Sequence, residues 1–261
     1  MIETFDPPLA DSNSAISRLR VPLEKSIHLD KDFFHNRPGP AFGQLKLGPF
    51  DNDLTVQAAA EPIGTRVIVH GNITDSAGVP VKHALVEIWQ ANSAGGYRDS
   101  LDVSGFPLDP NFYGAGRCLT DARGYYRFTT IRPGPYPAMF KDGARVWRAS
   151  HIHFSVLGAG CSSRLITQMY FEGDPLIRMD RMINAIPDRR GQERLIAKLE
   201  PENSISESFG PSRTLPTVDG SGAVIYPPKR TDPGAQLTKN PSALCYRFDV
   251  VLRGSAQTPF E

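Results

Sequence analysis

Two histidines, His151 and His153, alternate with apolar residues in the stretch Ser-His-Ile-His-Phe-Ser. In a β-strand, side chains two positions apart point to the same face, so the two imidazoles would stand side by side. Histidine is the commonest metal ligand, and two imidazoles on one strand face can bind a single metal ion. The pair could also be incidental, as exposed or core histidines, so the neighbouring residues decide between the two interpretations.

Two tyrosines upstream sit in distinctive backbone settings. Tyr136 lies between two prolines, whose fixed φ angles stiffen the chain, whereas Tyr97 follows two glycines that we expect to act as a hinge. A single tyrosine is more often a core or rim residue. Phenolate and imidazole together suit Fe(III), whose charge lowers the phenol pKa from its usual value of about 10 enough to ionise it. The four side chains together therefore favour an iron site.

Composition limits the partners of this chain. Its 261 residues carry 29 Lys and Arg against 28 Asp and Glu, with no dense basic run, which argues against nucleic acid and anionic membranes. No leader-like start and no apolar run near the roughly 18 residues of a spanning helix are present, so we expect a cytoplasmic protein with a small-molecule partner. Three cysteines without a Cys-x-x-Cys motif (Cys118, Cys161 and Cys245) read as buried thiols.

Short β signals separated by turn residues run along most of the chain. We expect strands over residues 65–75, 84–92, 125–131, 151–157, 164–171 and 243–253. Residues 191–200 carry an apolar stripe that predicts the one persuasive helix. This pattern predicts an all-β fold, a β-sandwich of mostly antiparallel strands with few helices.

The domain organisation expected is one catalytic β-sandwich over residues 65–261, preceded by an extended arm over residues 1–64 that belongs to the same unit. The arm is broken by prolines but carries apolar anchors such as Phe33, Phe34 and Phe42. Because these anchors lack a core of their own, we expect the arm to wrap over a surface and the chain to form an oligomer. Residues 201–241, rich in Pro, Gly and Ser, are expected to be an ordered insertion before the last strand.

Several strings, in order, resemble the non-haem Fe(III) intradiol ring-cleaving dioxygenases. They are residues 85–92 (Leu-Val-Glu-Ile-Trp-Gln-Ala-Asn), 107–112 (Pro-Leu-Asp-Pro-Asn-Phe), 134–137 (Gly-Pro-Tyr-Pro), 151–154 (His-Ile-His-Phe), 165–168 (Leu-Ile-Thr-Gln), 170–176 (Tyr-Phe-Glu-Gly-Asp-Pro-Leu) and 246–249 (Tyr-Arg-Phe-Asp). The resemblance extends over about residues 40–200 and 243–254. It is greatest to the heteromeric class of the family, in which an iron-bearing chain assembles with a related α-like chain.

The resemblance implies one Fe(III) per chain, bound by Tyr97, Tyr136, His151 and His153. It places Arg148 over the substrate ring, where its charge stabilises the bound catecholate, and Gln168 just behind the ligands. Without this resemblance, we would expect Arg148 to form a salt bridge at the end of a strand and Gln168 to be an exposed strand residue. We also expect Tyr97 to be catalytic, leaving the iron when a catechol binds, because its two glycines form the hinge. Trp89 and Trp147 are expected in the core.

The implied reaction inserts both atoms of O2 into a catechol and gives a cis,cis-muconate, with protocatechuate (3,4-dihydroxybenzoate) as the expected substrate. Residues 1–64 contain no tyrosine, and Ala138 stands where the class usually has tryptophan, so a sulfocatechol or hydroxyquinol type of substrate is the alternative. Two other classes compete. One is a zinc hydrolase that adds His70 or His83 to the histidine pair, and the other is a non-catalytic β-sandwich binding module.

Overall fold

A computed structural model describes residues 47–99, 102, 105–140, 143–158, 164–204, 208–211, 217–218, 224–225, 237–240, 242–252 and 257–259, and the statements that follow concern these residues. Most of the expected arm and insertion therefore lies outside the described residues. No helix in the described part of the chain is long and apolar enough to cross a membrane.

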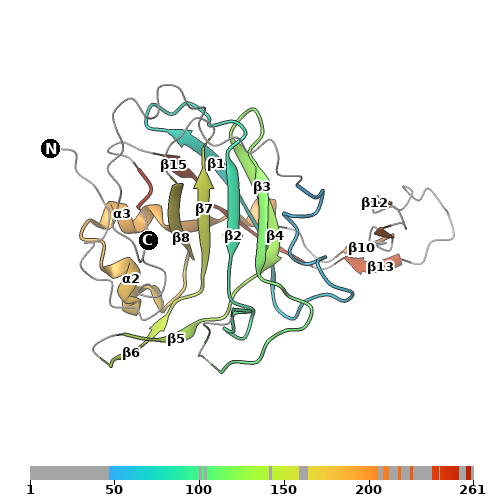
Figure 1. The fold of residues 1–261 in the computed structure, drawn as a ribbon, viewed down its shortest axis with the longest axis horizontal. Helices are drawn as coiled ribbons and strands as arrows, with labels where there is room; N and C mark the ends of the chain where they lie inside the picture. Colours follow the sequence, from blue (N-terminus) through green and yellow to red (C-terminus); the bar gives the residue numbers. More distant parts are fainter. Residues whose placement is uncertain are drawn as a thin grey trace, which may run out of the picture.

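Nine strands form one sheet in the order β15-β1-β14-β9-β8-β7-β2-β3, with β4 paired to β1 (Figure 1). Their bounds are β1 (Arg66–Asp75), β2 (Leu85–Trp89), β3 (Ala115–Leu119), β4 (Tyr125–Ile131), β7 (His151–Leu157), β8 (Arg164–Phe171), β9 (Ile196–Leu199), β14 (Leu244–Arg247) and β15 (Val250–Leu252). The pairs are antiparallel except those of β1 with β14, β1 with β15, and β8 with β9. The predicted mostly antiparallel all-β fold is confirmed.

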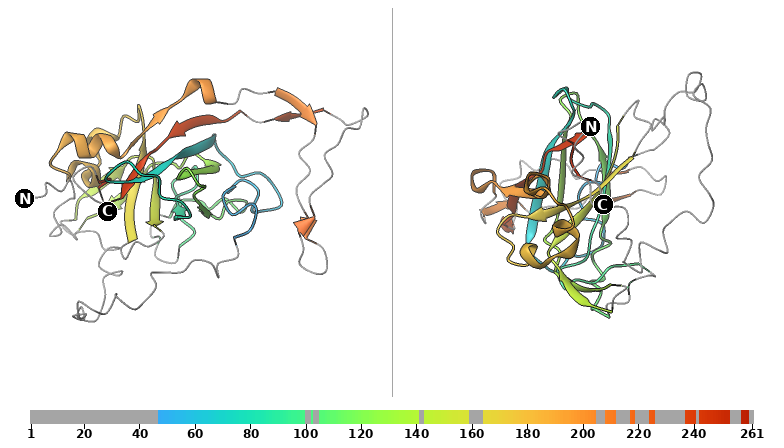
Figure 2. Two further views of the ribbon diagram at one scale, coloured as in Figure 1. Left: turned by 90° about the horizontal axis from the view of Figure 1, so that it is seen from above. Right: turned by 90° about the vertical axis from the view of Figure 1, so that its left-hand side faces the viewer.

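The sheet folds over one large hydrophobic core, so its strands lie in two facing layers (Figure 2). On β1, Val67 and Val69 are fully buried in this core, as the alternation along the strand requires. The opposite layer contributes Phe154 from β7 and Phe171 from β8, both fully buried. Ahead of the sheet, Leu54 also belongs to the core, so residues just before β1 pack on the domain.

A smaller cluster holds the helical segment against the end of β8. Its buried members are Ala149, Tyr170, Ile183, Ile186 and Leu195. The segment comprises η3 (Ile177–Met179), α2 (Arg181–Asn184) and α3 (Arg189–Arg194), and η4 (Pro201–Asn203) follows β9. Asp180 begins α2 as its N-cap, accepting a hydrogen bond from the Met182 backbone N–H.

Three short two-stranded ribbons lie outside the large sheet. One, β5 (Tyr136–Met139) with β6 (Arg145–Arg148), lies at the end of the sheet where β7 begins (Figure 1). The other two belong to the expected insertion and pair β10 (Ser208–Pro211) with β13 (Leu237–Asn240) and β11 (Thr217–Val218) with β12 (Val224–Ile225).

The structure corrects two sequence-based expectations of the fold. The predicted helix over residues 191–200 is wrong in its second half, because α3 ends at Arg194 and β9 follows. A short apolar stripe is compatible with both the helical and the strand period. Here residues 196–199 form a strand because they pair with β8 and β14. The predicted last strand is split into β14 and β15 at Phe248, whose backbone N–H bonds instead to the His70 carbonyl.

Candidate metal centre

The two histidines lie side by side at the start of β7, as the alternation predicted. Their ring centroids are 4.9 Å apart. In the ladder, His153 is opposite Trp89 of β2 and Gln168 of β8, so neighbouring strands fix its place. His151 is 1 % exposed and His153 is 8 % exposed, which shields both imidazoles from bulk water.

Each histidine meets one of the two tyrosines. The Tyr136 hydroxyl lies 3.3 Å from Nε2 of His151, and the Tyr97 hydroxyl lies 3.2 Å from Nε2 of His153. The two phenol rings are perpendicular, with centroids 5.4 Å apart. Two phenol oxygens and two imidazole nitrogens therefore converge on one place from β5, β7 and the segment after β2.

The protonation of His151 suits metal binding. Its Nδ1 lies 2.6 Å from the Ala149 carbonyl oxygen, a contact that assigns the proton to Nδ1 and leaves Nε2 as the donor atom. Burial holds the pKa of His151 well below its ordinary value, and the charges of Arg148 and His153 lower it further. A neutral imidazole is the form that binds a metal, so the donor set fits a non-haem iron ion.

The loop that carries Tyr97 is tied down. Asn92 Oδ1 accepts hydrogen bonds from the backbone N–H groups of Ala94 and Gly96, at 2.9 and 3.0 Å. Gly95 has a φ of 92°, and a Cβ there would lie 2.6 Å from the Pro135 carbonyl oxygen. Glycine is needed at position 95 for the close approach of this loop to the segment that carries Tyr136, and the departure of Tyr97 from the iron stays a prediction.

Arg148 does not share a strand with the histidines. It ends β6, opposite Tyr136 of β5, and β7 begins three residues later. Its side chain is nevertheless buried beside the site: Nη2 donates to Gln168 Oε1 and, at 3.1 Å, to the Tyr170 hydroxyl. Nε lies 3.1 and 3.0 Å from the two Asp180 oxygens, so the salt bridge expected without the family is also present.

Asp180 links this arginine to the backbone before His151. Its fully buried carboxylate also accepts hydrogen bonds from the backbone N–H groups of Ala149 and Met182, each at 2.9 Å. One carboxylate thus fixes the Arg148 guanidinium, the chain entering β7 and the start of α2. Sequence reasoning missed it. An aspartate before a short helix is readable as an N-cap, but its contact with an arginine 32 positions away is not.

Gln168 is buried, which corrects its interpretation as an exposed strand residue. Its Oε1 accepts hydrogen bonds from Arg148 and, at 2.8 Å, from the Tyr170 hydroxyl. Its Nε2 is buried and has no hydrogen-bond partner among the described residues. A buried donor left without an acceptor costs about 1–3 kcal/mol, which marks this amide as a group available to a bound ligand.

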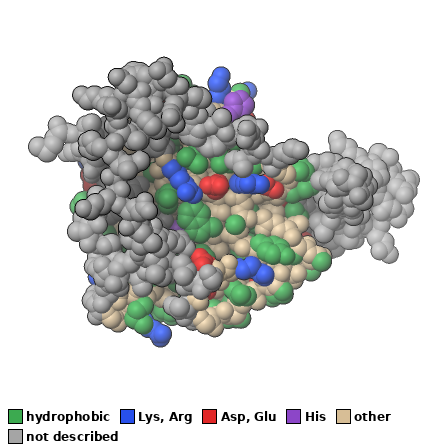
Figure 3. Space-filling model, viewed as in Figure 1, with side chains coloured by type: hydrophobic (Ala, Val, Ile, Leu, Met, Phe, Trp, Pro, Cys, Tyr) green, Lys and Arg blue, Asp and Glu red, His purple; other side chains and the backbone are tan. Residues whose placement is uncertain are grey.

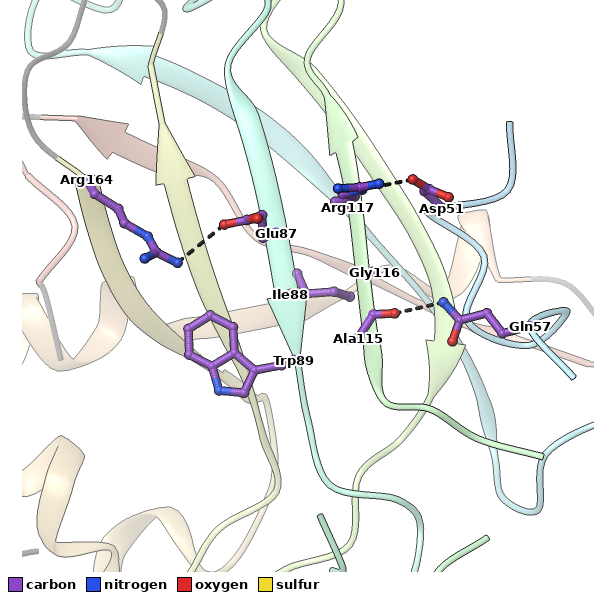
Figure 4. A pocket seen from close by; sticks show the side chains of 9 residues that line it. All are labelled: Asp51, Gln57, Glu87, Ile88, Trp89, Ala115, Gly116, Arg117 and Arg164. Atoms are coloured by element: carbon purple, nitrogen blue, oxygen red, sulfur yellow. Dashed lines mark hydrogen bonds and ion pairs between the residues drawn. The ribbon is translucent and has the colours of Figure 1, made fainter. Parts of the chain in front are cut away.

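The tryptophans differ from the expectation that both lie in the core. Trp147 is 47 % exposed. Trp89 stacks on His153 with centroids 4.9 Å apart, and it also lines a groove on the outer side of β2 and β3 (Figure 4). That groove is edged by the ion pairs of Arg117 with Asp51 and Arg164 with Glu87 and includes none of the four candidate ligands. Acidic and basic side chains of the described residues alternate on this face and form no basic patch (Figure 3).

The spare histidines do not complete a zinc site with the histidine pair. His70 Nε2 lies 2.9 Å from Glu200 Oε2, and His83 is exposed with a φ of 56°. Among the described residues, the group of three His, Cys, Asp or Glu donors is His70, Glu200 and Cys245, which includes neither His151 nor His153.

Comparison with known proteins assigns the family. A family model described as Dioxygenase matches residues 38–254. The chain is 40 % identical over 244 residues to a protocatechuate 3,4-dioxygenase beta chain from Burkholderia cepacia, covering 93 % of this chain and 88 % of that protein. The chain belongs to the intradiol dioxygenases. The resemblance noted in its motifs is thus confirmed, and this intradiol dioxygenase is an enzyme of a family that uses non-haem iron.

Other relatives of this intradiol dioxygenase are more distant. A hydroxyquinol 1,2-dioxygenase from Rhizobium sp. is 30 % identical over 164 residues, covering 56 % of this chain and 53 % of that protein, so the match spans about half of each. The crystal structure of 3-chlorocatechol 1,2-dioxygenase from Rhodococcus opacus aligns with a TM-score of 0.50 and 19 % identity, covering 84 % of this chain and 71 % of the other. The latter supports the fold alone.

Proposed function

We propose that this intradiol dioxygenase cleaves protocatechuate between its two hydroxylated carbons to a cis,cis-muconate. It would use one Fe(III) per chain, held by Tyr97, Tyr136, His151 and His153. The observation that carries the proposal is the convergence of two phenol oxygens on two histidine Nε2 atoms at 3.2 and 3.3 Å. The name of the Burkholderia relative supports the choice of substrate.

Bound Fe(III) would supply Lewis-acid activation of the catechol and a template for it and O2. The chain's own groups supply the rest. The catechol hydroxyls lose both protons on binding: the Tyr97 phenolate is the base that accepts one of them as it leaves the iron, and the other passes to water. The Arg148 guanidinium, fixed beside His151, stabilises negative charge on the bound catecholate. Gln168 Nε2 has a hydrogen bond to give to a substrate oxygen.

Oxygen uptake by the iron-loaded protein tests the reaction. We expect a burgundy protein with one iron per chain and the highest kcat/KM for protocatechuate among protocatechuate, 4-sulfocatechol, hydroxyquinol and catechol. A higher value for sulfocatechol or hydroxyquinol would transfer the proposal to that substrate class. A colourless protein that consumes no catechol would overturn the function, and hydrolysis supported by zinc would favour the hydrolase alternative.

We also propose that the chain works in an oligomer, either with copies of itself or with a related α-like chain. The support is the beta-chain relative, which matches 93 % of this sequence. Light scattering of the purified enzyme, alone and after co-expression with a candidate α-like chain, tests this. A fully active monomer of 28.7 kDa would contradict it.

A further inference from the structure

A second cluster of ligand-type side chains lies away from the candidate iron centre. His70 of β1, Cys245 of β14 and Glu200, which follows β9, place one donor atom each within 4.8 Å of one another. The three strands are neighbours in the sheet, in the order β1-β14-β9. The candidate iron ligands lie instead on β5, β7 and the segment after β2, so the two clusters share no residue and no strand.

The alternation of the strands explains why these three side chains meet. On β1, Val67 and Val69 face the large core, so His70 faces the other side. Ile68 lies two residues before His70 and therefore faces the same side of β1. Cys245 is the ladder partner of Ile68 and packs against Ile68 in a small hydrophobic cluster. The Glu200 backbone N–H bonds to the Cys245 carbonyl at 2.8 Å, which places Glu200 beside the thiol.

The cluster is held in place and reachable from solvent. His70 Nε2 lies 2.9 Å from Glu200 Oε2, and Asn203 donates to the same oxygen at 2.6 Å. The Cys245 backbone N–H donates to Ser204 Oγ at 3.0 Å. The side chains of His70 and Glu200 are 13 % and 17 % exposed, whereas Cys245 is 3 % exposed. An ion could thus enter on the histidine and glutamate side and meet the thiol beneath.

We propose that His70, Glu200 and Cys245 bind one divalent cation of borderline-soft character, with Zn²⁺ as the type. Imidazole, carboxylate and thiolate are all ligands of zinc, with distances of about 2.0–2.3 Å, which puts donors in a tetrahedron roughly 3.3–3.7 Å apart. The donors here already lie within 4.8 Å, so small side-chain rotations complete the site. One carboxylate and one thiolate neutralise the charge of the ion, and water can take the fourth position.

Binding must displace a proton from sulfur. Burial raises the pKa of the Cys245 thiol, and the charge of Glu200 raises it further, so the free protein holds the thiol form. The cation replaces this proton, which leaves to solvent. It also replaces the hydrogen bond between His70 and Glu200, and the proton of that bond moves from His70 Nε2 to Nδ1 or to solvent. A bound ion would connect β1, β14 and the turn after β9, so we expect it to stabilise this side of the sheet. This inference does not depend on the proposed function.

Cadmium titration of the iron-loaded enzyme tests the site, because a thiolate bound to Cd²⁺ gives an ultraviolet sulfur-to-metal charge-transfer band. We expect one Cd²⁺ per chain in addition to iron, with a band that is lost in Cys245→Ser and kept in Cys118→Ser. Cys118 is a suitable control, since burial raises its thiol pKa to about 12 and it lies on β3. Iron content should be the same in all three proteins, which separates this result from failure of the iron centre.

A second variant guards against loss of folding in Cys245→Ser. His70→Gln keeps a hydrogen-bond donor toward Glu200 but removes the imidazole, and we expect it to weaken Cd²⁺ binding at least about tenfold, the lower end of losses at metal-site positions. A wild-type enzyme that binds no Cd²⁺ in equilibrium dialysis, or a band that persists in a folded Cys245→Ser protein, would overturn the proposal.

Discussion

The two donor clusters of this molecule differ in what holds the far sides of their ligands. In the candidate iron centre the far sides of the ligands are occupied: His151 Nδ1 contacts the Ala149 carbonyl and the Tyr97 loop is bound by Asn92, so the ligand atoms face one another. Ligand atoms contact each other in both clusters: the two tyrosine hydroxyls lie 3.3 and 3.2 Å from the histidine Nε2 atoms, and His70 Nε2 lies 2.9 Å from Glu200 Oε2. An ion must replace these contacts in either cluster, and in the first the hydrogen bonds on the far sides of the ligands keep the donors in place when it does.

Replacing a histidine of the first cluster should have the largest effect. We expect His151→Ala or His153→Ala to abolish iron binding, burgundy colour and ring cleavage, because a lost ligand opens a four-residue donor set. His83→Ala, at an exposed histidine, is the matched control and should retain all three. Metal analysis with oxygen uptake measures this, and the cadmium band of the second cluster should persist. Full iron content and activity in either variant would remove the site from β7.

We expect Tyr97 and Tyr136 to contribute more equally to iron binding than the glycines before Tyr97 and the prolines around Tyr136 predicted. Both phenols are half-buried, and their contacts with histidine, 3.2 and 3.3 Å, are nearly equal. With Gly95 held in place, Tyr97→Phe and Tyr136→Phe should weaken iron binding by amounts within about tenfold of each other. Iron titration measures this, and resonance Raman of each variant with substrate identifies the phenolate that leaves. A much larger loss of iron affinity in Tyr136→Phe would instead support the prediction that the prolines hold Tyr136 on the iron while the glycines let Tyr97 leave.

The difference between the clusters also explains what the sequence could predict. His151 and His153 are readable because strand alternation places neighbours two residues apart on one face. The second cluster joins positions 70, 200 and 245, which only the sheet order brings together. The strands over residues 125–131, 151–157 and 164–171 were predicted with their observed bounds, because alternation and turn residues mark them. The short strands β3, β5 and β6 were missed, since their four or five residues carry too little pattern.

Arg148 sharpens the comparison, because it is buried beside the first cluster, whereas Arg127 and Arg247, whose charges act on the second cluster, are exposed. We expect Arg148→Ala to keep iron and colour but to lower kcat by roughly 10²–10³-fold, the loss typical of a removed charge-stabilising donor. Arg164→Ala is the control, since Arg164 pairs with Glu87 at the surface and is 47 % exposed. Steady-state kinetics with protocatechuate measures the change in kcat of both variants. An unchanged kcat would assign Arg148 a structural role only, in its contacts with Asp180, Gln168 and Tyr170.

Asp180 is the support whose removal would make the first cluster less prearranged. Asp180→Asn preserves size but removes the charge facing Arg148, and its single amide oxygen can serve only one of the Ala149 and Met182 backbone N–H groups, which bond to different Asp180 oxygens. We expect kcat to fall by roughly 10–100-fold with iron content unchanged, as for groups that orient a site through another residue. Asp188→Asn is the matched control: Asp188 caps α3 in the same way but pairs with Arg190 at the surface, so kcat should stay within about twofold.

The double variant separates positioning from general stabilisation. If Asp180 acts through Arg148, adding Asp180→Asn to Arg148→Ala should slow turnover little further, because the two residues form one contacting unit whose effects do not add. The substitution that costs roughly 10–100-fold alone should then cost less than about threefold in the Arg148→Ala background. Thermal unfolding of all four proteins accompanies the kinetics. If instead the two losses multiply, Asp180 supports β7 and α2 through its backbone contacts, and the contacts of Arg148 with Gln168 and Tyr170 are enough to place the arginine.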